Sequence, residues 1–216
     1  MNTPLLLSGS AGTIELFLDH PNGIPQGIAL LGHPHPLMGG TAEHKVLITL
    51  SKALQERGYL VARPNFRGVG QSSGSHDHGI GETSDMEEIL EWMRSEYPGL
   101  PLVLGGFSFG AWIAARLQER LQPRNITPVT TILTGTAVGK VDSGRDYHTP
   151  HLHGEALIIH GANDDIIRLN AVLDWANEQD RAIVVIPAAD HFFNRKQQVL
   201  QQVISHHLDR ILIHCR

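Results

Sequence analysis

The segment GGFSFGAW, residues 105–112, places three glycines around one serine. It follows the apolar run PLVL (101–104) and leads into the helix-forming run AARLQERL (114–121), so it lies where a strand passes into a helix. Residues 106–110 match the pattern G-x-S-x-G, in which the serine occupies a sharp turn and the glycines leave room for the backbone. A plain tight turn has the same composition, so the rest of the chain must decide whether Ser108 is a nucleophile.

Apolar runs and amphipathic runs alternate along the whole chain. This alternation predicts an α/β fold, with a mostly parallel twisted sheet covered by helices on both faces. The length of 216 residues favours one domain, residues 1–216. The interval 138–154 holds no clear element and is too short for a substantial lid domain. The expected strands are 13–19, 27–34, 59–66, 101–108, 129–137, 155–164 and 181–192, and the expected helices are 43–58, 83–99, 110–121, 170–179 and 195–212.

Composition excludes several classes of function. The net charge is −5 and no basic block occurs, so we expect neither nucleic acid nor an anionic membrane as a partner. The only cysteine, Cys215, cannot form a disulfide within the chain, which fits a reducing compartment. The N-terminal region lacks the charged start of a signal peptide, and no apolar run reaches the roughly 18 residues of a membrane span. We therefore expect a cytoplasmic protein.

Two further polar residues follow later strands. Asp164 comes after the run ALIIH, and His191 comes after the run AIVVIPAAD. In an open α/β sheet, functional groups collect beyond the carboxyl ends of the strands, so these residues and Ser108 should meet at one edge. A serine hydroxyl needs a histidine to take its proton, and a carboxylate to orient that histidine. The order Ser…Asp…His therefore predicts a catalytic triad, with Asp165 as the alternative acid.

The chain contains 14 histidines, which raises the possibility of a metal centre. The segment HTPHLH supplies His148, His151 and His153, and HPHP supplies His33 and His35. Neither CxxC nor HExxH occurs, and Leu37 and Met38 stand where a metallohydrolase pattern would need Asp and His. We expect no metal and no other cofactor.

These motifs together resemble the α/β-hydrolase superfamily, and in particular its small lidless bacterial esterases, related to dienelactone hydrolases. The resemblance covers nearly the whole chain and rests on GHPHPLMGGT (32–41), RPNFRGVGQSSG (63–74), GGFSFGAW (105–112), IIHGANDD (158–165) and AADHFF (188–193). It implies a serine hydrolase and is much less specific for a substrate. HPHP stands in place of the HGGG-type run of lipases.

The HPHP segment should supply part of an oxyanion hole. A tetrahedral oxyanion needs two backbone N–H donors, and one should belong to Phe109, directly after the nucleophile. Because Pro34 and Pro36 have no N–H group, we predict Leu37 as the second donor, with His35 as the alternative. The side chains of His35 and Met38 should line the substrate pocket, unless the prolines simply stiffen a turn.

The sequence thus predicts hydrolysis of small carboxylic esters or thioesters through an acyl-enzyme on Ser108. Lactone or peptide hydrolysis on the same triad is the alternative within this chemistry. A metal-dependent hydrolase using the histidine-rich loops and a non-catalytic binding protein are the alternatives from other classes. The expected partner is a small-molecule ester, and the sequence indicates no oligomeric state.

Overall fold

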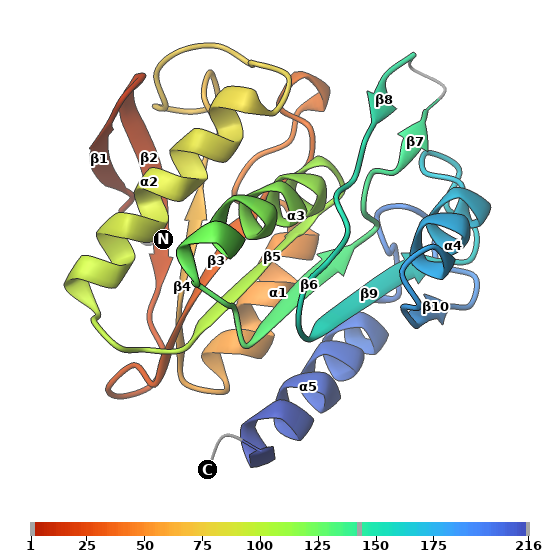
Figure 1. Ribbon diagram of the computed structural model, residues 1–216. Coiled ribbons are helices and arrows are strands. Elements are labelled where there is room, and N and C mark those ends of the chain that lie inside the picture. Colours follow the sequence, from red (N-terminus) through yellow and green to blue (C-terminus); the bar gives the residue numbers. More distant parts are fainter. Residues whose placement is uncertain (1–2, 142–143, 215–216) are drawn as a thin grey trace.

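A central sheet of eight strands forms the middle layer of the computed structural model, which describes residues 3–141 and 144–214 (Figure 1). Cys215 lies outside the described residues. The strand order is β1-β2-β4-β3-β5-β6-β9-β10. The strands are β1 (Leu5–Gly9), β2 (Gly12–Asp19), β3 (Gly27–Gly32), β4 (Tyr59–Pro64), β5 (Leu102–Phe107), β6 (Thr130–Thr134), β9 (Ala156–Gly161) and β10 (Ile183–Ile186).

Helices cover both faces of this sheet, as the alternating pattern predicts. On one face, apolar residues of α1 (Lys45–Gln55) and α5 (Gln197–His214) pack on the strands in one buried cluster. On the other face, α2 (Ile80–Glu96), α3 (Phe109–Leu121) and α4 (Leu169–Asn177) contribute to a second cluster. The central strands β3, β4 and β5 are buried along their whole length, because helices cover them from both sides.

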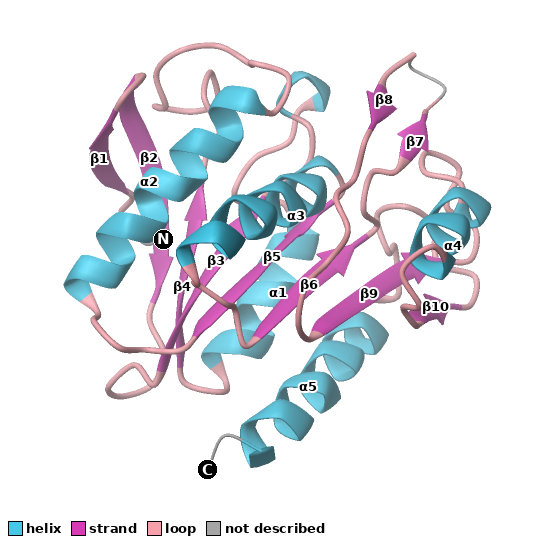
Figure 2. Ribbon diagram, in the orientation of Figure 1, coloured by secondary structure: helices cyan, strands magenta, loops and turns pink. Residues whose placement is uncertain are grey.

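Within the eight-stranded sheet, only β2 runs against the common direction: β1 pairs antiparallel with β2, and β2 pairs antiparallel with β4. The remaining neighbours in the sheet pair in parallel. The carboxyl ends of β5, β6, β9 and β10 therefore lie along one edge, where loops gather (Figure 2). This arrangement brings the segments after β5, β9 and β10 together.

Several elements differ from the sequence prediction. Strand β1 was not predicted, and the interval 138–154 contains the short strands β7 (Gly139–Lys140) and β8 (Asp146–Tyr147). The expected strand 181–192 is wrong in length, since β10 ends at Ile186 and Ala188 and Phe193 have positive φ. The expected strand 27–34 also ends early, because the chain leaves β3 for the 3-10 turn η1 (Pro36–Met38).

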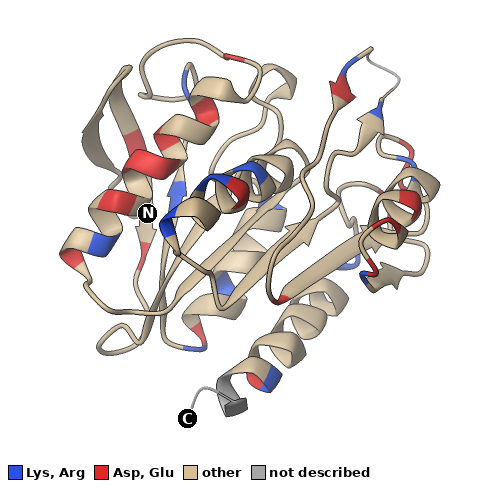
Figure 3. Cartoon of the chain, viewed as in Figure 1, with Lys and Arg blue, Asp and Glu red and all other residues tan. Residues whose placement is uncertain are grey.

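Acidic residues lie along α2, and basic residues lie on the neighbouring α3 (Figure 3). Arg124 lies in the 3-10 turn η2 (Gln122–Arg124) and bonds to Glu87 at 3.0 Å and to Glu91 at 2.7 Å. Arg120 of α3 reaches the Glu87 carboxylate at 3.5 Å. These pairs are partly or largely exposed, so each contributes little to stability and mainly sets how α2 lies on α3.

Candidate active site

Ser108 lies in the turn between β5 and α3, with the backbone in a conformation that a side-chain-bearing residue rarely adopts. Its φ is 56° and its ψ is −119°. Such a conformation costs about 1–3 kcal/mol and persists only where the surroundings impose it. Here the Ser108 N–H donates to the Thr134 carbonyl of β6 at 2.9 Å, and the Ser108 carbonyl accepts from Ala111 and Trp112 of α3. The strand-to-helix turn predicted from the sequence is therefore present.

The three glycines of the opening segment have distinct packing reasons. A Cβ on Gly106 would collide with the Gly110 carbonyl, and one on Gly110 would collide with the Gly32 carbonyl of β3. These two glycines let the first turn of α3 sit close to the sheet. A Cβ on Gly105 would lie 2.9 Å from the Ile132 carbonyl oxygen, so Gly105 permits the close approach of β5 and β6. Only Gly106 and Gly110 serve the turn itself.

The structure brings the three predicted triad residues into one chain of hydrogen bonds. His191 Nε2 lies 3.0 Å from Ser108 Oγ, and His191 Nδ1 lies 2.7 Å from Asp164 Oδ2. Because a carboxylate only accepts, Nδ1 carries the proton and Nε2 is left to accept from the serine hydroxyl. His191 is 2% exposed and Asp164 is 9% exposed, whereas the alternative acid, Asp165, is exposed. The carboxylate that contacts His191 is that of Asp164.

The Asp164 carboxylate is held from several sides. Its Oδ1 accepts the backbone N–H groups of Ile166 at 3.0 Å and Ile167 at 2.8 Å. A second histidine, His160 of β9, places its Nε2 3.3 Å from Asp164 Oδ2 and 2.9 Å from the Ile167 carbonyl. Since both neighbours are acceptors, His160 Nε2 carries a proton and donates. Burial lowers the pKa of His160, so it donates as a neutral imidazole.

Sequence reasoning did not identify His160. Its side chain is fully buried at the end of a strand, where a histidine usually has a purely structural role. The available signal was its position four residues before Asp164, directly ahead of the loop that carries this carboxylate.

The predicted oxyanion donors differ in whether their N–H groups already have a hydrogen-bond partner. The Phe109 N–H begins α3 and has no hydrogen-bond partner among the described residues. The Leu37 N–H donates to His35 Nδ1 at 3.2 Å, as part of the cap of η1. The His35 N–H has no partner within the described ranges. Of these two amides, that of His35, which the sequence gave only as the alternative to Leu37, is thus the one without a partner among the described residues.

Two other histidines near the site are neutral for identifiable reasons. Burial lowers the pKa of His33 to about 3, and its ring bridges the Pro34 carbonyl at 2.6 Å and the Phe66 N–H at 2.9 Å. Burial and the charge of Lys45 lower the pKa of His44 to about 4. The His44 ring stacks on Phe107 with centroids 5.0 Å apart. Both histidines hold loops in place beside the triad.

A cavity of about 220 Å³ is lined by His35 and by Phe109, the residue directly after Ser108. The segment before α2, the start of α3 and strand β8 complete its walls. His35 lines it, as the sequence predicted. Met38 does not: its side chain is 71% exposed, because η1 turns Leu37 and Met38 outward.

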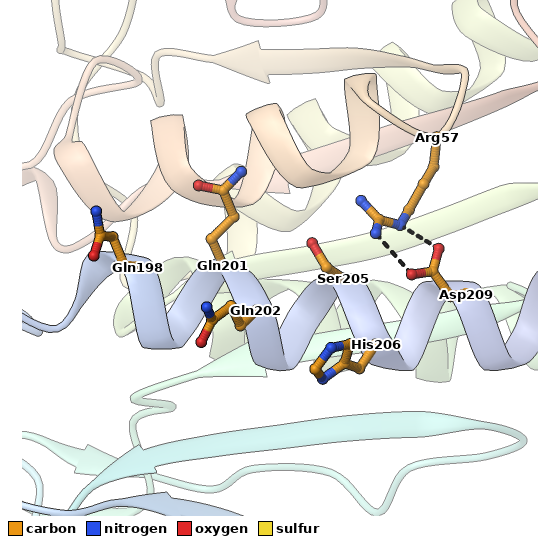
Figure 4. A pocket seen from close by; sticks show the side chains of 7 residues that line it. All are labelled: Arg57, Gln198, Gln201, Gln202, Ser205, His206 and Asp209. Atoms are coloured by element: carbon orange, nitrogen blue, oxygen red, sulfur yellow. Dashed lines mark hydrogen bonds and ion pairs between the residues drawn. The ribbon is translucent and has the colours of Figure 1, made fainter.

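A larger hollow of about 480 Å³ lies between α1 and α5, away from the triad (Figure 4). Its wall is polar, with Gln198, Gln201 and Ser205 along α5. Arg57 and Asp209 face each other across it and form two hydrogen bonds of 2.8 and 2.9 Å. The pairing fastens the end of α1 to α5, and the hollow contains none of the triad residues.

The histidine-rich segment after β8 is attached through its backbone. The His148 carbonyl accepts from Trp112 Nε1 at 2.9 Å, and the His153 carbonyl accepts from Gln118 at 2.7 Å. Across residues 3–141 and 144–214, no three His, Cys, Asp or Glu side chains are placed to share a metal ion. Within the same residues, no helix combines the length and the apolar character needed to cross a bilayer.

Comparisons with known proteins support the fold described above. Residues 37–153 match the family model described as alpha/beta hydrolase fold. A crystal structure of a lidless α/β serine hydrolase from Xanthomonas campestris superposes with a TM-score of 0.87 at 34% identity, covering 96% of this chain and 93% of that one. A structure of an α/β serine hydrolase homologue from Coxiella burnetii gives a TM-score of 0.85 at 31% identity, covering 96% and 97%.

Among curated proteins, an uncharacterized protein of Rickettsia prowazekii is 37% identical over 94% of this chain and 87% of its own length. The lysophosphatidylserine lipase ABHD12 of Gallus gallus is 31% identical over 48% of this chain, which corresponds to 28% of the lipase. The family match spans more than half of the chain, and the Xanthomonas neighbour, which covers 96% of it, is described as lacking a lid. The chain therefore belongs to the α/β-hydrolase family, in its lidless bacterial branch.

Proposed function

We propose that this protein is a serine hydrolase that cleaves small carboxylic esters or thioesters. The observation that carries this proposal is the hydrogen-bonded chain from Ser108 Oγ through His191 to Asp164, built on a strained strand-to-helix turn. A strained serine whose hydroxyl faces an imidazole nitrogen is suited to nucleophilic attack on a carbonyl.

The reaction follows from these positions. Ser108 Oγ attacks the ester carbonyl while His191 Nε2 takes the hydroxyl proton, and Asp164 stabilises the resulting imidazolium. The imidazolium then protonates the leaving alcohol or thiol, which leaves an acyl group on Ser108. A water molecule gives its proton to His191 and attacks the acyl-enzyme, which releases the acid and restores the serine.

The oxyanion formed in both steps needs preorganised donors. We place the Phe109 N–H as the first, because it follows the nucleophile and has no partner among the described residues. For the second, the structure favours the His35 N–H over that of Leu37, because Leu37 already donates to His35 Nδ1 at 3.2 Å. Loss of one such donor typically costs about 10²- to 10³-fold in kcat.

The curated lipases similar to half of this chain are described as acting on lysophosphatidylserine, and this supports ester hydrolysis in general terms. This chain spans about 28% of the length of the avian lipase, so we do not infer that it shares the substrate of these lipases. The absence of a lid in the Xanthomonas neighbour supports a site open to small, accessible esters.

The test is hydrolysis of p-nitrophenyl acetate by the parent and by Ser108→Ala. We expect kcat to fall by at least about 10⁴-fold, with an unchanged circular dichroism spectrum. Ser205→Ala is the matched control, because Ser205 lies in the hollow between α1 and α5 and should leave the rate unchanged. Equal rates for Ser108→Ala and the parent would refute the proposal. A series of p-nitrophenyl esters of increasing chain length, and a lactone, would then define the substrate range.

A further inference from the structure

The cavity beside the triad has an unusual lining. Its wall consists of His35, His76, His78, Phe109, Trp112 and residues 145–147. Apolar rings and nitrogen-bearing side chains therefore share one space of about 220 Å³. A substrate group that fits such a space needs both a flat apolar part and an oxygen-rich polar part.

The aromatic part of the wall is fixed in place. The Phe109 and Trp112 rings have centroids 5.4 Å apart, and Trp112 meets Tyr147 edge to face at 5.2 Å. Trp112 Nε1 is already used, because it donates to the His148 carbonyl at 2.9 Å. The apolar faces of these rings are what this side of the cavity offers to a ligand.

The polar part of the wall includes a buried donor. His35 is 6% exposed, and its Nδ1 accepts from the Leu37 N–H at 3.2 Å. The neutral ring therefore carries its proton on Nε2. This Nε2 has no hydrogen-bond partner among the described residues. A buried donor without an acceptor costs free energy, so a ligand that supplies an acceptor gains what the apo protein lacks.

The electrostatics of the cavity favour a negatively charged acceptor. Burial, the charge of Arg145 and the neighbouring His76 and His78 lower the pKa of His35 to about 4. The positive charge of Arg145 would also attract an anion. Two acidic residues lie nearby: Asp146 also lines the cavity and is exposed to solvent, and the Glu82 carboxylate lies 2.7 Å from His76 Nδ1. We therefore assign the attraction for an anion to Arg145 and not to His76.

We propose that this cavity binds a carboxylate at the far end of the substrate's acyl chain, so that the preferred substrates are monoesters of dicarboxylic acids. The Arg145 guanidinium and His35 Nε2–H donate to the carboxylate, and the acyl chain of the substrate lies on the rings of Trp112 and Tyr147. One guanidinium with one imidazole donor suits a single carboxylate, because arginine binds the two oxygens side by side. The inference rests on the proposed esterase function and names its substrate class.

The experiment compares esters of equal carbon number with and without the charge. The anionic pair is mono-4-nitrophenyl adipate and mono-4-nitrophenyl suberate, and the neutral pair is 4-nitrophenyl hexanoate and octanoate. The measured quantity is the ratio of kcat/KM for the anionic ester to that for its neutral partner. In Arg145→Gln we expect this ratio to fall by about tenfold or more, with the neutral esters within about twofold of the parent. Arg145→Lys keeps the positive charge but loses the two parallel N–H donors of the guanidinium. Its ratio should therefore lie between those of the parent and Arg145→Gln.

Arg124→Gln is the matched control, because it makes the same change at a surface ion pair on η2. Its ratio should equal that of the parent. Thermal melts of all variants verify that they fold. If neutral esters are hydrolysed and Arg145→Gln leaves the ratio unchanged, the carboxylate site is refuted while the esterase function stands. If no ester is hydrolysed, the proposed function itself fails.

Discussion

Two groups of histidines lie on either side of Ser108, and they differ in what their nitrogens face. His191 and His160 both reach the Asp164 carboxylate, at 2.7 and 3.3 Å. His35, His76 and His78 instead line one cavity with Arg145; the rings of His35 and His78 lie 4.6 and 5.1 Å from that of His76, whose Nδ1 lies 2.7 Å from the Glu82 carboxylate. The Asp164 carboxylate orients His191, whereas burial and the charge of Arg145 keep His35 neutral, with a proton to donate. We propose that histidines serve the chemistry in the first group and substrate recognition in the second.

The largest expected effect lies in the first group. Asp164→Asn removes the charge that stabilises the His191 imidazolium and reverses the tautomer preference, so kcat for p-nitrophenyl acetate should fall by about 10³- to 10⁴-fold. Asp165→Asn is the control and should stay within about twofold of the parent, because Asp165 is exposed. Comparable losses in both variants would show that the acid has been assigned wrongly.

A smaller loss is expected at His160, which acts through Asp164 and is a positioning residue. His160→Phe removes the imidazole that bonds to the Ile167 carbonyl and lies 3.3 Å from Asp164 Oδ2, so kcat should drop by about 10- to 100-fold with little change in KM. His160→Gln keeps an N–H donor and should recover part of that loss. If both variants lose only stability, with kcat unchanged in the folded fraction, His160 has no part in the reaction.

The neutral histidines predict a dependence of stability on pH. An unfolded histidine gains a proton near pH 6.5, whereas folded His33 stays neutral down to about pH 3. The unfolded chain then binds more protons between these values, so the free energy of unfolding falls as the pH drops below 6.5. For His33 alone the loss at pH 5 is about 2 kcal/mol. Urea unfolding at pH 7.5 and 5.0 measures it, and His33→Gln should show a weaker dependence. Equal stability of the parent at both pH values would contradict this account.

The smallest expected effect distinguishes the histidines that line the cavity from those beside the Asp164 carboxylate. His78 is exposed, lines the cavity and has a φ of 49°, which asparagine tolerates. His78→Asn should lower kcat/KM for mono-4-nitrophenyl adipate by about two- to threefold and leave 4-nitrophenyl hexanoate unchanged, because one exposed group contributes little to charge recognition. Equal changes for both esters would place His78 outside substrate recognition.

The sequence predicted the sheet, its helices and the meeting of Ser108, Asp164 and His191, because long apolar runs and their polar ends report on strands and loops. It missed the edge strand β1, because its residues are all exposed or half-buried and show no apolar periodicity. It extended the last strand to residue 192, although a positive φ at Ala188 ends the extended backbone. It also missed His160, and it ranked the amide of Leu37 above that of His35, since both depend on which nitrogen faces which neighbour.

The central claim is that Ser108 is the nucleophile of an acyl-enzyme. A fluorophosphonate probe, followed by peptide mass spectrometry, tests it directly. The account predicts one adduct per chain, located on Ser108, lost in Ser108→Ala and retained in His78→Asn. Esterase activity without an adduct on Ser108, or an adduct elsewhere in the chain that accounts for the activity, would contradict it.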